Sequence, residues 1–132
     1  NLKYKIFQEF FMKKILTILI LLISTSFIYA EGINLGDFPI GKWLDANWDA
    51  TWEFKSDNIR ILDTNGGVVY DFNGKTIKNF KLSPSTSGLK LSFRCEETGK
   101  DYEFVKGLTN LDLEMIIDTD TGIHYEVKLP KQ

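Results

Sequence analysis

The side chains that most often carry catalysis or bind metals are sparse in this sequence. Its 132 residues contain one histidine, His124, and one cysteine, Cys95. Structural zinc sites use several Cys or His ligands, and a catalytic triad needs a histidine placed beside its nucleophile. His124 lies between Ile123 and Tyr125 on the charged side of an alternating segment, so we expect it to face solvent.

The acidic residues offer two interpretations. The segment 118–122, Asp-Thr-Asp-Thr-Gly, begins as a calcium loop does, but the bidentate glutamate of such a loop does not follow it. The same residues are typical of a hairpin turn, which we favour. Glu96 and Glu97 lie at the approach to a turn, where nothing raises a carboxyl pKa for acid–base work. Asp112 and Glu114 likewise occupy outward or turn positions, where no burial is expected to raise a carboxyl pKa. The sequence predicts a protein that is not an enzyme, with no metal site and no cofactor.

The first thirty residues have the order of a secretory signal peptide. From Met12, two lysines precede the apolar run 15–23, and small residues precede Ala30. We expect cleavage after Ala30 and export to the periplasm or outside the cell. A retained anchor is the alternative, although the apolar run is shorter than the roughly 20 residues of a membrane-spanning helix. Residues 1–11 precede the signal, and we interpret them as an upstream segment that is non-native or mis-annotated.

Residues 31–132 have the length of one domain with one core. They contain 12 Lys and Arg and 17 Asp and Glu, a formal net charge of −5, and the basic residues are scattered singly. Nucleic acid and anionic membrane surfaces are therefore poor candidates as partners; we expect no nucleic-acid partner and no stable membrane insertion after signal cleavage. A single cysteine forms no internal disulfide. Cys95 shares a strand face with apolar residues, so we expect a buried, reduced thiol and a monomeric protein.

Short segments of alternating apolar and polar residues occupy nearly all of this domain. Connections of two to five residues join most of them, which forces sequence neighbours to pair antiparallel. Such a meander leaves two open edges unless it closes on itself. The sequence therefore predicts an all-β fold, an up-and-down meander of eight or nine strands closed into a small barrel with an apolar interior. The expected strands are 41–45, 49–55, 58–63, 68–72, 76–82, 89–97, 102–106, 111–117 and 123–129.

Two places interrupt the regular pattern. The apolar residues of 76–82 do not keep one parity, which predicts a bulge near Lys78 and Asn79. Residues 83–88, Ser-Pro-Ser-Thr-Ser-Gly, form the one longer polar loop. The alternation also directs Val68 and Ile123 inward. Three apolar residues fall on outward faces, where they could form an exposed patch: Leu62, Val69 and Ile116.

The first expected strand carries a recognisable triplet. Gly41-Lys42-Trp43, at the start of an all-strand meander, resembles the Gly-x-Trp signature of the lipocalin and avidin families, the calycin group. The match consists of Gly41 and Trp43 alone. In those families the tryptophan packs across the closed end of the barrel. The resemblance implies a lipocalin-like barrel with Trp43 at its base and a ligand in its mouth.

The inward aromatic rows support two hypotheses about function, because an eight-stranded barrel can be filled by side chains or can hold one small ligand. The first is an exported protein that binds a small apolar or amphipathic molecule in the barrel mouth. The alternative is a protein-interaction or inhibitor module of the cell envelope with a filled barrel, which binds through the loop 83–88 or the outward patch. The candidate ligand-binding residues are Trp43, Trp52, Phe54, Tyr70, Phe93, Tyr102, Phe104 and Tyr125.

Overall fold

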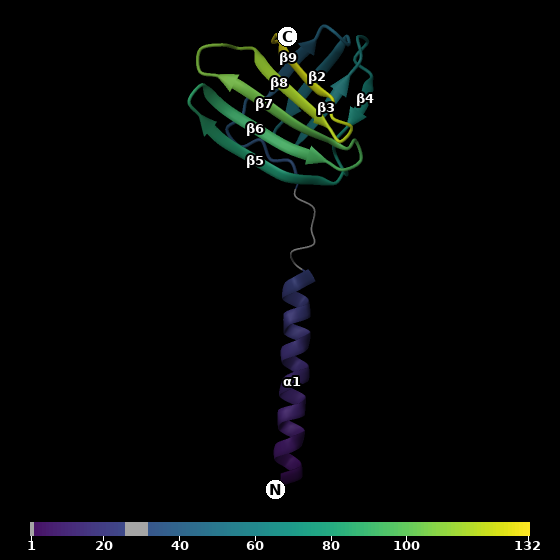
Figure 1. The fold of residues 1–132 in the computed structure, drawn as a ribbon, viewed down its shortest axis with the longest axis vertical. Coiled ribbons are helices and arrows are strands. Elements are labelled where there is room, and N and C mark those ends of the chain that lie inside the picture. The colour runs from purple at the N-terminus through teal and green to yellow at the C-terminus, as the bar shows by residue number, and fades with distance from the viewer. Residues whose placement is uncertain (1, 26–31) are drawn as a thin grey trace. The chain divides into compact units, whose positions relative to one another are not determined.

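The computed structural model describes residues 2–25 and 32–132 (Figure 1). The chain divides into two compact units, Asn1–Ala30 and Glu31–Gln132. The first unit contains helix α1, Leu2–Thr25. Among the described residues, no helix combines the length and the apolar character that crossing a bilayer requires. The predicted cleavage after Ala30 falls outside the described residues, so it stays a prediction.

The described part of the second unit, residues 32–132, contains nine strands, and the predicted all-β antiparallel meander is confirmed (Figure 1). Each strand pairs antiparallel with its neighbours, in a four-stranded sheet of order β1-β2-β3-β4 and a five-stranded sheet of order β5-β6-β7-β8-β9. The strands are β1 (Gly41–Asp45), β2 (Ala50–Lys55), β3 (Asn58–Leu62), β4 (Val68–Asp71), β5 (Ile77–Ser85), β6 (Gly88–Cys95), β7 (Lys100–Gly107), β8 (Leu113–Thr119) and β9 (His124–Leu129).

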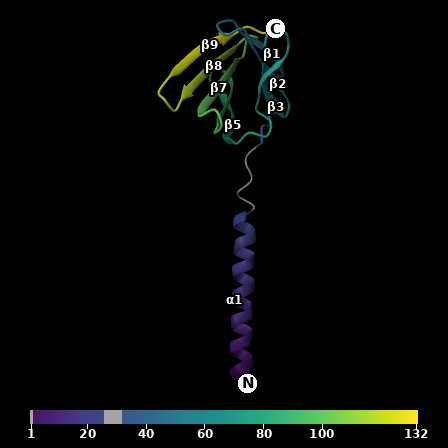
Figure 2. The ribbon, with the colours of Figure 1, turned by 90° about the vertical axis from the view of Figure 1, so that its right-hand side faces the viewer.

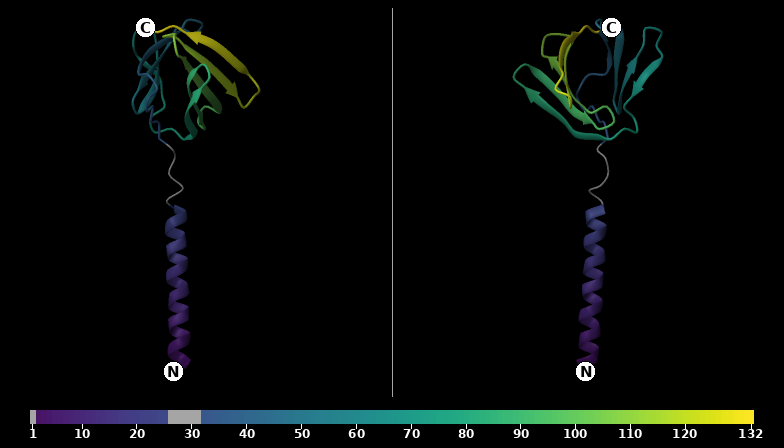
Figure 3. Two further views of the ribbon diagram at one scale, coloured as in Figure 1. Left: turned by 90° about the vertical axis from the view of Figure 1, so that its left-hand side faces the viewer. Right: turned by 45° about the vertical axis from the view of Figure 1, so that its right-hand side comes forward.

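The two sheets face each other across one core, but they are not joined into a single hydrogen-bonded barrel (Figures 2 and 3). Along one seam, the residues after β9 pair with β1. The N–H of Leu44 donates to the Pro130 carbonyl at 2.9 Å, and the N–H of Gln132 donates to the Lys42 carbonyl at 2.9 Å. Along the other seam, β4 and β5 are consecutive in the chain yet belong to different sheets. The predicted barrel closure is therefore not confirmed.

Irregular backbone on both strands accounts for this open seam. In β4, Leu62 pairs with Val68 and Ile61 pairs with Tyr70, so Val69 is an extra residue that bulges the edge. In β5, the register shifts between Lys78 and Lys81. The bulge predicted near Asn79 is thus confirmed, and Asn79 itself has φ of 55°. Bulges bend a strand and interrupt its row of edge hydrogen bonds, so neither edge offers the other a regular partner.

The long polar loop predicted at 83–88 is wrong. Strand β5 continues to Ser85, which pairs with Gly88, so Thr86 and Ser87 alone form the turn. Pro84 is tolerated within β5 because β5 is an edge strand, where the missing N–H breaks no second ladder. The hairpin requires glycine at residue 88, because a Cβ there would lie 1.9 Å from the Lys106 carbonyl oxygen.

Three predicted side-chain positions are also wrong, all at strand ends. Ile123 and Val68 were expected inside, but they are 62% and 51% exposed. Ile123 belongs to the β8–β9 turn, beyond the ladder that starts at His124. Leu62, expected in an exposed patch, is 4% exposed. It lies at the bulge, where pairing with Val68 replaces the regular alternation.

Candidate functional site

The eight aromatic residues predicted to bind a ligand are brought together, and they form the core. Six of them are at most 4% exposed, whereas Tyr70 and Tyr125 are half-buried. Their rings contact one another: Phe104 lies 5.0 Å from Phe54 and 5.3 Å from Trp52 between ring centroids. Phe93 and Tyr102 stack at 5.1 Å. Aromatic pairs at these distances are in direct contact, so the rings occupy the space between the sheets.

Trp43 fixes one end of this core. Its side chain is fully buried, and its indole N–H donates to the Leu111 carbonyl at 2.9 Å. The ring meets Phe54 edge-on at 5.3 Å, and the Lys131 ammonium lies 5.9 Å from the ring centre. Trp43 therefore joins β1 of the four-stranded sheet to the loop before β8 of the five-stranded sheet.

Cys95 lies beside the open seam and is fully buried, as its strand alternation predicted. Its sulfur is 3.7 Å from the Tyr70 hydroxyl and 3.6 Å from a Glu97 carboxylate oxygen. Burial raises the pKa of Tyr70 above its usual value. Glu97 accepts hydrogen bonds from the hydroxyl and N–H of Thr76, which lower its pKa to about 2. The carboxylate thus stays ionised, and the cluster ties β4 to the start of β5.

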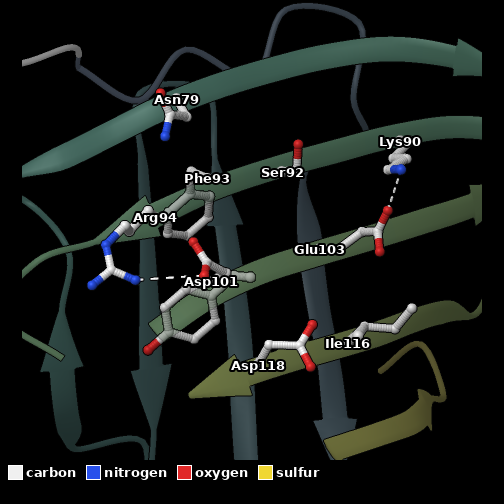
Figure 4. A pocket seen from close by; sticks show the side chains of 10 residues that line it. Asn79, Lys90, Ser92, Phe93, Arg94, Asp101, Glu103, Ile116 and Asp118 are labelled. Carbon is white, nitrogen blue, oxygen red and sulfur yellow. Dashed lines mark hydrogen bonds and ion pairs between the residues drawn. The ribbon is translucent and has the colours of Figure 1, made fainter. Parts of the chain in front are cut away.

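A shallow hollow of about 260 Å³ lies on the outer face of the five-stranded sheet (Figure 4). Its charged side chains are bonded to one another. Two nitrogens of Arg94 donate to Asp120 at 2.8 and 3.0 Å, which raises the pKa of Arg94 and lowers that of Asp120. Asp101 adds a contact at 3.5 Å, and Lys90 pairs with Glu103. Mutually paired charges of this kind are typical of a solvated sheet face.

His124 extends this charged face onto β9 and is exposed, as predicted. Its Nδ1 lies 2.5 Å from an Asp118 oxygen, and its Nε2 lies 3.4 Å from a Glu126 oxygen. The hydrogen bond to Asp118, and then that to Glu126, raise the pKa of His124. Both ring nitrogens therefore face carboxylates, an arrangement that favours the protonated imidazole.

The segment 118–122 forms a hairpin turn. The N–H of Thr119 donates to the Ile123 carbonyl, and the N–H of Gly122 donates to the Thr119 carbonyl. The Asp120 carboxylate binds Arg94. Within the described residues, no group of three or more His, Cys, Asp or Glu side chains is arranged to hold a metal ion.

One polar cluster escaped the sequence analysis, and it lies where the β1–β2 turn meets β9. Asp45 is 2% exposed, and its carboxylate accepts hydrogen bonds from the Tyr125 hydroxyl at 3.0 and 3.1 Å. The same carboxylate accepts the backbone N–H of Asn47 at 3.0 Å, and the Asn47 side chain donates to the Tyr125 oxygen at 3.0 Å. Burial raises the pKa of Tyr125. The sequence indicated only part of this cluster, through the Asp-x-Asn spacing of Asp45 and Asn47 in a turn. The other part, Tyr125, lies 80 residues after Asp45.

The most exposed of the three tryptophans, Trp48, directly follows Asn47 of this cluster in the β1–β2 turn. Trp48 is 73% exposed, whereas Trp43 and Trp52 are at most 3% exposed. The Trp48 side chain lies near the Tyr125 hydroxyl, where it opposes part of the rise in the pKa of Tyr125 that burial causes. Most of the Trp48 side chain therefore faces solvent. The chain matches no protein-family model, no curated protein and no solved structure.

Proposed function

We propose that residues 31–132 form an exported, non-enzymatic interaction module whose interior is filled and whose binding surface lies on its outside. One observation carries this proposal: the inward aromatic residues pack against one another at 5.0–5.3 Å between centroids. Side chains that already pack against one another leave little room between the sheets for a ligand. Export rests on the signal-like order of residues 12–30.

The outside of the domain supplies a suitable anchor in Trp48. Tryptophan is among the residues most enriched at the energetic centres of protein interfaces. Trp48 is 73% exposed on a turn that is fixed by Asp45 and Tyr125. The patch expected from Leu62, Val69 and Ile116 is a weaker candidate, because Leu62 is buried and Ile116 is partly buried.

A small apolar ligand inside a calycin-type barrel is the second candidate. It is supported by the resemblance at Gly41 and Trp43 and by a hollow of about 130 Å³ that reaches Phe72 and Ile77. Pockets for drug-sized ligands usually measure roughly 300–1,000 Å³. This hollow is smaller, which is why we rank the ligand-binding function second.

The fluorescent apolar probe 1-anilinonaphthalene-8-sulfonate separates the two candidates. A filled interior should give no saturable binding of the probe and no energy transfer from the buried Trp52. Saturable binding with one site, abolished by Phe72→Trp but not by Trp48→Phe, would instead establish an internal ligand site.

Iodide quenching of tryptophan fluorescence tests the external surface. Trp48 should account for nearly all the quenching, and Trp48→Phe should remove it, because the other two tryptophans are buried. A partner fraction from the cell envelope should shield Trp48 from iodide. A partner that binds equally well to Trp48→Phe, and leaves the wild-type quenching unchanged, would disprove the role of this surface.

A further inference from the structure

The turn that carries Trp48 is rigid for reasons that are visible in its contacts. The N–H of Trp48 donates to the Asp45 carbonyl at 3.3 Å, and the Asp45 carboxylate accepts the preceding N–H, that of Asn47. Asp49 ends the turn with φ of 50°, a left-handed conformation that aspartate tolerates better than most residues do. The backbone of the turn is therefore held on both sides of the tryptophan.

The indole projects from this turn beside a hydrogen-bonded cluster. The Trp48 side chain lies near Tyr125, and the Tyr125 hydroxyl donates to the buried Asp45 carboxylate. Burying a carboxylate is costly unless it is fully hydrogen-bonded. Here the hydrogen-bonded carboxylate holds the backbone of the turn from which Trp48 projects into water, and such supporting contacts pre-organise a binding residue.

We propose that the exposed face of Trp48 is a preformed platform for a cationic side chain, an arginine or lysine of a partner protein. This inference rests on the interaction module proposed above and specifies the chemistry of its partner. The indole is the best aromatic partner for a cation. The residue that follows it, Asp49, is an exposed carboxylate, and residues 31–132 carry a formal net charge of −5. An acidic surface attracts basic partners and repels acidic ones.

The probe for this platform is the peptide acetyl-tetraarginine amide, titrated into the protein at low salt. The readout is the ¹H–¹⁵N signal of the Trp48 indole, assigned by its loss in Trp48→Leu. We expect this signal to shift saturably while the Trp43 indole, fully buried, stays in place. Trp48→Leu should weaken binding about tenfold, and Asp49→Asn should weaken it less. Acetyl-tetraglutamate amide should produce no shift.

Ile123→Leu is the matched control, because Ile123 is also a large exposed apolar residue next to a turn and should leave the affinity unchanged. The inference is overturned if the arginine peptide shifts the amides of Asp101 and Asp118 in the outer hollow but not Trp48, or if Trp48→Leu binds it as tightly as wild type. If an envelope partner still shields Trp48 from iodide in that case, the proposed interaction function stands, and only the cationic character of the partner is disproved.

Discussion

The two seams between the sheets are built in opposite ways. At the β1–β9 seam, the residues after β9 pair with β1 through backbone hydrogen bonds, and Asp45 binds Tyr125 across it. At the β4–β5 seam, bulges interrupt both strands, and a weaker polar contact links Tyr70 of β4 to Cys95 of the neighbouring strand β6. A meander can therefore bury one aromatic core while only one of its seams is hydrogen-bonded.

The difference shows what limits barrel closure in this fold. Both seams bring together strands with an apolar inner face, so hydrophobic burial does not distinguish them. What differs is the regularity of the edge: residues 130–132 offer β1 an extended partner, whereas Val69 and Asn79 distort β4 and β5. The regularity of the edge backbone decides which seam is closed by hydrogen bonds, because each ladder hydrogen bond needs its donor and acceptor in register.

The largest effect should come from Trp43, the core residue of the paired seam. Trp43→Ala should lower the free energy of unfolding by about 3–5 kcal/mol, because it removes a fully buried ring and its hydrogen bond to Leu111. Urea melts measure this value. Lys90→Ala, on the outer face, should change stability by no more than about 0.5 kcal/mol. Equal losses in the two variants would contradict the assignment of inner and outer faces.

Removing one tyrosine hydroxyl at each seam compares the two seams directly. Tyr125→Phe should cost about 1–3 kcal/mol, since it leaves the buried Asp45 carboxylate without its phenol donor. Tyr70→Phe, at the other seam, should cost less than about 1 kcal/mol, because its partner is a thiol, a weak hydrogen-bonding group. Denaturant melts of both variants give the comparison. A larger loss for Tyr70→Phe would reverse our ranking of the seams.

Labelling of Cys95 reports on the open seam alone. Because Cys95 is fully buried and free, it should react with a thiol reagent after denaturant is added and not before. Ser92→Cys, on the opposite face of β6, should react at once in the native protein. Rapid native labelling of Cys95 would show that β4 and β5 separate readily, and a disulfide-linked dimer would exclude the inward thiol.

The smallest effect concerns pH and lies on the outer face, away from both seams. Asp118 and Glu126 raise the pKa of His124 above 6.5. Their contribution to stability is therefore complete below about pH 6.5, the unfolded value, and is lost as pH rises through the folded pKa. His124→Gln should destabilise the domain slightly at pH 5.5 and not at pH 9. An NMR titration should show a midpoint above 6.5 that falls in Asp118→Asn.

The sequence by itself determined the strands and most of their faces. Alternation within one strand depends on that strand alone, so Leu91, Phe93 and Cys95 could be directed inward without knowing what they contact. Broken alternation located the bulge at Asn79 for the same reason. The turn chemistry of 118–122 was equally local, because a hairpin is completed by residues that are close in the chain.

Only the tertiary structure decided how the sheets meet and which groups they bring together. The contact of Asp45 with Tyr125 joins residues 80 positions apart, and no local pattern encodes such a pair. Whether aromatic rings fill an interior or line a cavity depends on the spacing of the two sheets, which the alternation of either sheet leaves open. Trp48 illustrates the limit: its sequence neighbours predict a turn, but the contacts from Asp45 to Tyr125 that fix this turn arise only when the last strand packs beside it.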